Sequence, residues 1–296
     1  AVTDMFEPGS TMKPFTVAVA MESGKYSPRS LFNTNPGTYR VHNKLVSDHQ
    51  NYGVIDLGTI ITKSSNVGTT QIALSLPREA LPTFLGRFGF GKNTGSGFPG
   101  ESAGRLQPPE RWRPVEIATM SYGYGLTTTA LQLAHGYATL ASGGIARPVS
   151  FTRVDGSVKG VRIIDKSVVD KLIPMMESVV TQDGTALKAA VPGYRIAGKT
   201  GTAHKAQAGG YASDAYMSLF VGLAPASSPR VVTAVIIDNP RKGGYYGGLA
   251  AAPVFSRMMS DTLRLMNIEP DRSAERLAEQ HRFPHPSTWP RQGREG

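Results

Sequence analysis

The sequence predicts a mixed α+β domain in which an antiparallel sheet is covered by helices. Segments with helical spacing dominate the first half of the 296 residues, and three short apolar runs separated by turn-forming residues follow in the last third. An apolar helical segment then closes this region. Helices first, then a strand meander and then a packing helix is an order typical of a sheet covered by helices. With 40% apolar and 18% charged residues, the chain has the composition of a folded domain with a sizeable core.

The first half is expected to hold five helices separated by loops. The first is apolar, has a proline near its first turn and ends at a glycine, and the last has threonines for capping and a Gly-Gly stop. The intervening segment 33–51 is rich in Asn, Gly, Asp and His, and 89–113 is rich in Gly and Pro, so both are predicted to be irregular. The predicted helices are 14–23, 56–63, 67–76, 78–88 and 127–142.

The second half is expected to contain the sheet. Short strands are predicted at 149–154 and 161–164, before a helix at 166–180. The three apolar runs 194–198, 215–223 and 231–238 have the pattern of neighbouring antiparallel strands, and 248–265 is predicted to be the closing helix. We expect the domain to span residues 1–266, followed by an extended, polar, Pro-rich tail at 267–296.

Composition and charge exclude several classes of protein. The chain has no cysteine, so disulfides and thiolate chemistry are excluded, and its six histidines show no metal-ligand spacing. We therefore expect no metal and no cofactor. The formal charge is +10, but the basic residues are scattered rather than interleaved with aromatic residues, which argues against nucleic acid as a partner. The apolar runs are also too short to span a membrane.

A serine and a lysine three residues apart stand at the start of the first predicted helix. Ser10 and Lys13 would share one face of that helix. A serine hydroxyl needs a base to become a nucleophile, and a partly buried lysine can lose its proton and act as that base. Backbone N–H groups at the helix start also lie where an oxyanion would form. On its own, however, the motif is equally typical of a helix cap followed by a solvated lysine.

A second group, Ser64-Ser65-Asn66, falls at the break between two predicted helices. The hydroxyl of Ser64 can relay a proton, and the amide of Asn66 can hold a substrate amide and a lysine amine together. Serine and asparagine also gather in loops because they favour turns, so this group alone does not assign a function.

A third group, Lys199-Thr200-Gly201-Thr202, ends a predicted strand. The lysine can bind a carboxylate, the two threonines can donate hydrogen bonds, and Gly201 would let a substrate backbone lie against the strand edge. Residues 193–200 also match the letters of a phosphate-binding loop, G-x-x-x-x-G-K-T. That loop needs a strand before it and a helix after it, and the sequence predicts neither.

Ser-x-x-Lys, Ser-x-Asn and Lys-Thr-Gly in this order are the motif set of penicillin-binding proteins and class A β-lactamases. The resemblance extends to class B penicillin-binding proteins, the division-type transpeptidases of Gram-negative bacteria, and covers Asp4 to Met266. It is carried by EPGSTMKPF around Ser10, DHQNYGVIDL from Asp48, ITKSSNVGT around Ser64, SYGYGLTTTALQLA from Ser121 and AGKTGTA around Lys199.

The resemblance implies the penicillin-binding and β-lactamase-like transpeptidase fold, with helices on both faces of a central antiparallel sheet and an all-helical subregion. In that family strands and a helix precede the Ser-x-x-Lys motif, whereas nine residues precede Ser10 here. We therefore expect the N-terminal strands of the fold to be missing from this chain.

The resemblance also assigns a role to each motif residue. It implies Ser10 as the acylated nucleophile, Lys13 as its base, and backbone N–H groups of Ser10 and Thr202 as the oxyanion hole. It implies Ser64 as the proton relay and Asn66 as the amide that anchors the substrate. The strand that binds the substrate carboxylate and backbone would be formed by Lys199, Thr200, Gly201 and Thr202. In division-type relatives an aromatic wall lines the site, and the residues that stand where it would arise are Tyr211, Tyr216, Tyr245 and Tyr246. His204 follows the third motif and is a further candidate for substrate contact, on position alone.

The function implied by the resemblance is that of a serine-type D,D-transpeptidase. It would cross-link peptidoglycan stem peptides ending in D-Ala-D-Ala during septal wall synthesis and be acylated by β-lactam antibiotics. A D,D-carboxypeptidase and a β-lactam-binding sensor domain are the alternatives. A class A β-lactamase would need a Glu-x-x-x-Asn loop between Asn66 and Lys199, and the sequence has none. The resemblance further implies divisome membrane proteins as partners, at the periplasmic face of the inner membrane, with an anchoring transmembrane helix absent from this chain.

Overall fold

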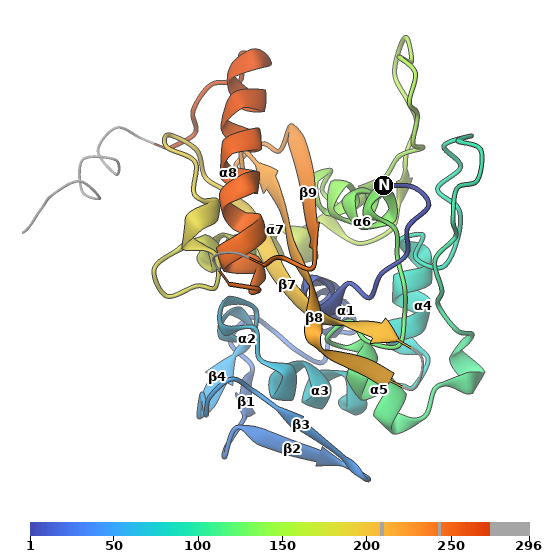
Figure 1. Cartoon of the computed structure of the whole chain (residues 1–296), viewed down its shortest axis with the longest axis vertical. Helices are drawn as coiled ribbons and strands as arrows, with labels where there is room; N and C mark the ends of the chain where they lie inside the picture. The colour runs from blue at the N-terminus through green and yellow to red at the C-terminus, as the bar shows by residue number, and fades with distance from the viewer. Residues whose placement is uncertain (208–209, 242–243, 273–296) are drawn as a thin grey trace, which may run out of the picture.

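A three-stranded antiparallel sheet forms the centre of the molecule (Figure 1). The computed structural model describes residues 1–207, 210–241 and 244–272. Strands β7 (Ala197–Gln207), β8 (Gly210–Ala224) and β9 (Val231–Asp238) lie in the order β7-β8-β9. The predicted meander is therefore confirmed, although β7 and β8 extend well beyond the predicted strands because the polar segment between them continues as a hairpin.

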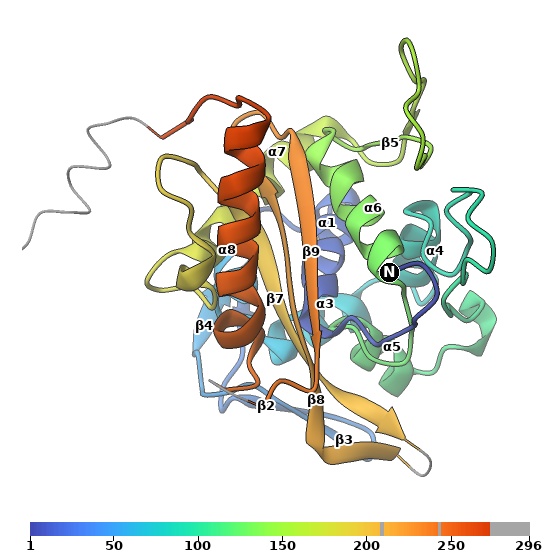
Figure 2. The ribbon, with the colours of Figure 1, turned by 45° about the horizontal axis from the view of Figure 1, so that its top comes forward.

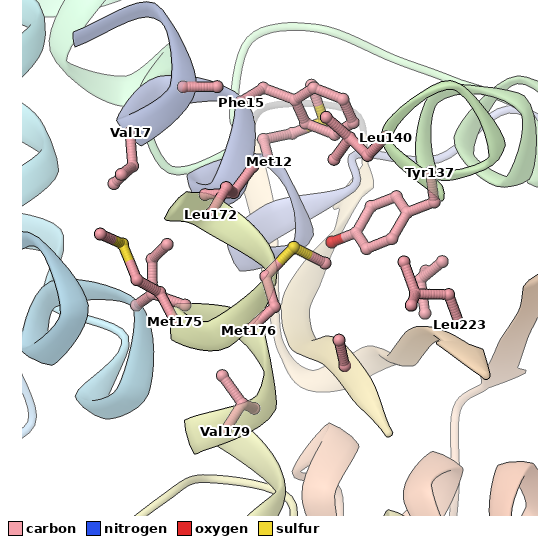
Figure 3. Packing of buried hydrophobic residues seen from close by; sticks show 14 of the residues in the cluster. Met12, Phe15, Val17, Tyr137, Leu140, Leu172, Met175, Met176, Val179 and Leu223 are labelled. Carbon is pink, nitrogen blue, oxygen red and sulfur yellow. The ribbon is translucent and has the colours of Figure 1, made fainter. Parts of the chain in front are cut away.

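Helices cover both faces of this sheet, as predicted (Figure 2). Successive residues of a strand point to opposite faces. On β8, Phe220 packs edge-on against Phe255 of α8 (Gly247–Leu265), with ring centroids 4.7 Å apart. Leu223 points the other way, toward the side of α1 (Lys13–Glu22), α6 (Ala130–Ala141) and α7 (Lys166–Glu177) (Figure 3).

Helix α1 is the buried centre of the core. Every residue from Lys13 to Met21 is buried, so this helix has no solvent-facing side over most of its length. Phe15 makes edge-on contacts with Phe88, Phe90 and Tyr137, with centroids 5.1 to 5.6 Å apart. The Tyr137 hydroxyl donates to a main-chain carbonyl in the turn before α1, at 2.8 Å (Figure 3). The start of α1 is thereby fixed by both apolar packing and a buried hydrogen bond.

The predicted all-helical subregion is formed by short helices. They are α2 (Leu57–Lys63), α3 (Asn66–Ser75), α4 (Ala80–Arg87) and α5 (Pro114–Met120). Of these, α2, α3 and α4 pack against α1, and α5 packs against α3. The sequence caps two of them: the Asp56 carboxylate accepts from Thr59 N at the start of α2, and the Ser65 hydroxyl accepts from Gly68 N at the start of α3. A capping box between Thr129 and Gln132 opens α6.

Two predictions about secondary structure are wrong. Segment 33–51, predicted as a loop, contains the hairpin β2 (Thr38–Val41) and β3 (Lys44–Ser47), and the flanking strands β1 (Leu31–Asn33) and β4 (Val54–Asp56) pair with each other. Their buried residues are single apolar side chains among polar ones, which left no periodic signal. The strand predicted at 149–154 is absent; β5 (Ile145–Ala146) pairs with β6 (Val161–Arg162) instead.

Four single-turn 3₁₀ helices complete the described elements. Helix η1 (Gly9–Met12) runs directly into α1, and the others are η2 (Pro109–Arg111), η3 (Ser178–Val180) and η4 (Leu187–Ala189). The predicted tail falls largely outside the described residues, because 273–296 are not described. In the described chain no helix is both long enough and apolar enough to cross a membrane.

Candidate active site

The three sequence motifs meet at one pocket of about 680 Å³. It opens between helix η1, the turn that joins α2 to α3, strand β7 with its hairpin, and the start of α8. The lining residues predicted from the sequence are Ser10, Ser64, Asn66, Thr200, Thr202, His204, Tyr216, Tyr245 and Tyr246. The fold therefore brings together residues that are far apart along the chain, among them Ser10 and Tyr246.

Ser10 lies in η1, one turn before the buried helix α1. The preceding Gly9 has a φ of +55° and donates its N–H to Gly123 O at 3.0 Å. A Cβ on Gly9 would lie 3.5 Å from Thr202 O and from Ala203 Cβ, so this turn packs directly against strand β7. Ser10 is thus presented at the pocket edge beside Thr202.

Lys13 is fully buried and reaches the second motif. Its Nζ donates to Ser64 O, to Ser64 Oγ at 3.0 Å and to Asn66 Oδ1 at 2.7 Å. Burial, followed by repulsion from the Lys199 charge, lowers the pKa of Lys13 well below its ordinary value, while the Asp48 carboxylate acts in the opposite direction. A lysine in this environment can exist as the neutral amine, which is the form a base requires.

The Ser64 hydroxyl lies between two buried lysines. Its Oγ accepts a hydrogen bond from Lys13 Nζ at 3.0 Å and from Lys199 Nζ at 2.9 Å. A hydroxyl has two acceptor lone pairs and one hydrogen, and both lysines donate to the oxygen in this arrangement. With both lone pairs occupied, the Ser64 hydrogen remains for a group in the pocket. Ser64 adopts a left-handed conformation, with φ of +61°, at the end of α2, which places its side chain in this position.

Asp48 organises the turn that carries Ser64 and Asn66. Its carboxylate accepts from the Ser65 hydroxyl at 2.6 Å, from Asn66 N at 2.5 Å and from Val67 N at 3.0 Å. The Asn66 side-chain amide also donates to Ser47 O at 2.9 Å, which fixes the amide with its oxygen toward Lys13. Asp48 was not predicted as a site residue, because it lies 18 positions before Asn66 and no local pattern links the two.

Lys199 is the second buried cation of the site. Besides Ser64 Oγ, its Nζ donates to Thr200 Oγ1 at 3.2 Å and to Thr200 O at 3.3 Å. No carboxylate pairs with it among the described residues, and burial lowers the pKa of Lys199 from 10.5 to about 7. The protonated form is therefore held near neutrality by hydroxyl and carbonyl oxygens alone.

The remaining residues of the third motif line the pocket or pack beneath it. Thr202 Oγ1 accepts from Gly247 N at 3.0 Å, so its hydrogen remains for a pocket ligand. Thr200 Oγ1 lies 2.9 Å from the Thr185 hydroxyl. A Cβ on Gly201 would lie 2.9 Å from Pro8 O and from Thr11 Cγ2. The close approach that requires glycine here is therefore that of β7 to the turn that carries Ser10.

Aromatic rings form one wall of the pocket. Tyr216 and Tyr245 stack with centroids 4.0 Å apart, and Tyr246 lies 4.5 Å from Tyr245. His204 contacts the Tyr216 ring at 4.6 Å. These four predicted residues line the pocket, whereas Tyr211 is not among the described residues that do.

Tyr124, His49 and Thr185 line the pocket but were not predicted. Tyr124 lies within SYGYG, a segment that the sequence analysis used only to recognise the family resemblance. Two glycines flank Tyr124 in the sequence, and this pairing was the available signal for a tight turn; both have positive φ in the structure.

The phosphate-loop match at 193–200 is excluded by the structure. Lys199 and Thr200 lie inside strand β7, so no helix follows them. Across the described residues, no three histidine or acidic side chains gather as a metal site.

Comparison with known proteins identifies the family of this chain. The family model for the penicillin binding protein transpeptidase domain matches residues 1–260. The chain is 46% identical over 270 residues to the peptidoglycan D,D-transpeptidase FtsI of Escherichia coli K12, covering 91% of this chain and 46% of that protein. It is 43% identical over 278 residues to the probable peptidoglycan D,D-transpeptidase PenA of Neisseria flavescens, covering 94% and 69%. The chain thus spans about half the length of the first of these relatives.

A solved structure shows the same fold. The apo TP domain of penicillin-binding protein 3 from Burkholderia pseudomallei superposes with a TM-score of 0.88 at 42% sequence identity, covering 92% of this chain and 83% of that one. The match of the family model over most of the chain, together with these relatives, establishes the family. This chain belongs to the penicillin-binding protein transpeptidase domain family.

Proposed function

We propose that this chain is the catalytic domain of a serine-type D,D-transpeptidase that cross-links peptidoglycan stem peptides during septal wall synthesis. The observation that carries the proposal is the Ser64 hydroxyl, hydrogen-bonded by the two buried lysines Lys13 and Lys199 in the pocket that also contains Ser10. This arrangement supplies a nucleophile, a base and a proton relay in one place.

Acylation follows from these contacts. The neutral amine of Lys13 takes the proton of Ser10 as its oxygen attacks the carbonyl carbon of the penultimate D-Ala. Backbone N–H groups of Ser10 and Thr202 are the proposed donors to the oxyanion. The C–N bond then breaks, and the leaving amine receives a proton through the Ser64 hydroxyl, whose hydrogen is free for that purpose. The product is an ester between Ser10 and the donor peptide.

The second half-reaction transfers this acyl group to an amine. The amine of a second stem peptide attacks the ester carbonyl, and the proton that it loses returns to Ser10 through the same groups. No carboxylate occurs among the described residues that line the pocket, so none of these residues can act as a carboxylate base for water. This supports transfer to an amine and slow hydrolysis of a β-lactam adduct, as opposed to β-lactamase activity.

The pocket also suits the free carboxylate of a D-Ala-D-Ala terminus or of a β-lactam. The Thr202 hydroxyl accepts from Gly247 N, and its hydrogen has no acceptor among the described residues, so it is available to a ligand. The ammonium of Lys199 lies beneath Thr200 on the same strand. The paired rings of Tyr216 and Tyr245 provide an apolar surface for the rest of the ligand.

Location, partners and the domain boundary complete the proposal. A peptidoglycan substrate places the domain at the periplasmic face of the inner membrane, with divisome membrane proteins as partners, in line with the resemblance to the division-type transpeptidases. We also keep residues 1–266 as the domain and 267–296 as a tail, and the family match over residues 1–260 supports this division.

A donor peptide thioester mixed with a D-amino acid acceptor tests the reaction. We expect the protein to form the aminolysis product, with Ser10→Ala inactive and Ser23→Ala unaffected, since the Ser23 hydroxyl lies at the other end of α1 and bonds to Ala20 O. If only the free acid forms at every acceptor concentration, the protein is a D,D-carboxypeptidase. If Ser10→Ala retains activity, the assignment of the nucleophile is wrong.

A further inference from the structure

Glu7, three residues before the nucleophile, accepts hydrogen bonds from two other segments of the chain. Its Oε1 accepts from Gly125 N at 2.8 Å and from the Tyr211 hydroxyl at 3.1 Å. The second oxygen, Oε2, is buried and has no hydrogen-bond partner among the described residues. Burial raises the pKa of Glu7, while both hydrogen bonds lower it. Partial burial of a carboxylate costs free energy because the charged group loses water, so the contacts of Glu7 need an explanation.

The backbone around Glu7 is already tied to the segment that contains Gly125. Phe6 and Thr128 exchange two main-chain hydrogen bonds, at 3.0 and 2.9 Å, and Gly9 N donates to Gly123 O at 3.0 Å. Gly123 has no room for a side chain, because its Cβ would lie 2.0 Å from Gly9 O. The segment that carries Ser10 is therefore joined to residues 123–128 by backbone hydrogen bonds at both Phe6 and Gly9.

The Tyr211 hydrogen bond adds the β7–β8 hairpin to these joined segments. Tyr211 lies near the start of β8 and half of its surface is exposed. Its ring contacts the edge of Tyr124, with centroids 5.6 Å apart. Tyr124 lines the pocket, while Tyr211 is absent from the described lining residues. Among the described residues, the Tyr211 side chain therefore meets the pocket lining at the ring of Tyr124.

We infer that Glu7 is a positioning residue that holds the Tyr124 ring in the pocket wall beside Ser10. Its Oε1 binds the hairpin through the Tyr211 hydroxyl and the turn after Tyr124 through Gly125 N, and these two hydrogen bonds are called the latch below. Tyr211 then acts through Glu7 and is not itself a substrate contact. This inference rests on the proposed function, because it concerns how that site binds its acyl donor.

Saturation kinetics of Ser10 acylation by a fluorescent penicillin test the latch, because they separate the apparent dissociation constant from the acylation rate constant. We expect Glu7→Ala to raise the dissociation constant about tenfold and Tyr211→Phe about threefold, as a hydrogen bond to a carboxylate is lost. The rate constant should stay within about twofold in both, since Lys13 and Ser64 are untouched. The double variant should be no weaker than Glu7→Ala alone, because both changes remove the same latch.

Two matched variants make the test specific. Glu7→Gln keeps an oxygen that can accept from Gly125 N and Tyr211, so it should bind within about threefold of the unaltered protein. Tyr26→Phe removes a hydroxyl that bonds Ser75 Oγ at 2.6 Å outside the pocket, and it should bind normally. Three results would each overturn the inference. The first is an increase in the dissociation constant of the double variant equal to the two single increases combined. The others are a dissociation constant of Glu7→Gln as high as that of Glu7→Ala, and equal increases in Tyr26→Phe and Tyr211→Phe.

Should Glu7→Ala not fold, the comparison of Tyr211→Phe with Tyr26→Phe decides the question. Failure of the proposed function has a separate signature, because the unaltered protein would then not be labelled at all.

Discussion

At the scale of single residues, the site places two lysines where water cannot reach them. Lys13 and Lys199 are both fully buried, and both donate to the same hydroxyl of Ser64. A pKa lowered from 10.5 to about 7 at Lys199 corresponds to a cost on the order of 5 kcal/mol when the pH is below 7, at about 1.36 kcal/mol per pH unit. Burying these lysines therefore lowers the free energy of unfolding, which is a cost of this arrangement of the site.

Lys199→Met should stabilise the protein at low pH and inactivate it. Methionine has a similar length and carries no charge, so we expect the free energy of unfolding at pH 6 to rise by about 2 kcal/mol. The sign follows from the lowered pKa: between about pH 7 and 10.5 the unfolded chain holds the Lys199 proton and the folded chain does not, so stability rises with pH across that window. The variant should show a flatter profile there. Urea unfolding at several pH values measures this.

Asp48→Asn should move the pH dependence of acylation. Asparagine keeps an oxygen that can accept from Asn66 N and Val67 N, but it removes the charge that raises the pKa of Lys13. The other charge that acts on Lys13 is that of Lys199, which remains. The pKa of Lys13 should fall, so the acid limb of the acylation rate should shift to lower pH. Stopped-flow acylation by a penicillin between pH 5 and 9 measures the shift.

The matched control for this prediction is Asp56→Asn. Asp56 caps the neighbouring helix α2 by accepting from Thr59 N at 2.7 Å, and no contact links it to Lys13. Both variants should keep most of their stability, because asparagine caps a helix about as well as aspartate. A shift of the acid limb in both variants, or in neither, contradicts the role given to Asp48.

The residues that belong to the three motifs could be predicted from the sequence, but the residues that position them could not. Ser10, Ser64 and Lys199 stand in short patterns whose order along the chain is informative by itself. Asp48, Glu7 and Thr185 act through contacts with residues 15 to 204 positions away. Sequence spacing contains no information about such contacts until the fold is known.

At the scale of elements, the site depends on how closely strand β7 approaches helix η1. Helix periodicity and the apolar runs of β8 and β9 predicted these elements well, because each buries a continuous apolar face. The short strands β1 to β4 were not predicted, because their polar sequences are typical of loops. Yet β3 ends at Ser47, directly before Asp48, so this small hairpin determines where the second motif lies.

Gly201→Ala should separate β7 from the turn that carries Ser10. The new Cβ would lie 2.9 Å from Pro8 O and from Thr11 Cγ2, so either the strand or the turn must shift. We expect a loss of about 2 kcal/mol in the free energy of unfolding, and a loss of acylation larger than unfolding explains. Denaturant unfolding and penicillin labelling at the same protein concentration check both effects.

Gly86→Ala is the control for this change. Gly86 lies in α4 with no atom within 4 Å of the position of a Cβ, so alanine should stabilise the helix by about 0.5 kcal/mol and leave labelling unchanged. Equal labelling of Gly201→Ala and the unaltered protein would contradict the proposed importance of this contact.

At the scale of the whole molecule, the fold brings three motifs that are distant in the sequence together at one pocket. The buried helix α1 carries Lys13, the helical subregion carries Ser64, and the sheet carries Lys199. Each motif was ambiguous alone, as a helix cap, a turn or a strand end. The fold removes the ambiguity, because Ser64 Oγ lies within 3.0 Å of both lysine nitrogens.

The most direct test of the central claim is the mass of the protein after incubation with benzylpenicillin. The tryptic peptide Ala1–Lys25 contains both Ser10 and Ser23, because trypsin does not cleave between Lys13 and Pro14, so fragmentation of this peptide must locate the adduct. We expect one penicilloyl group per chain, located at Ser10, absent in Ser10→Ala and retained in Ser23→Ala. An adduct at another residue, or labelling that persists in Ser10→Ala, would contradict the account.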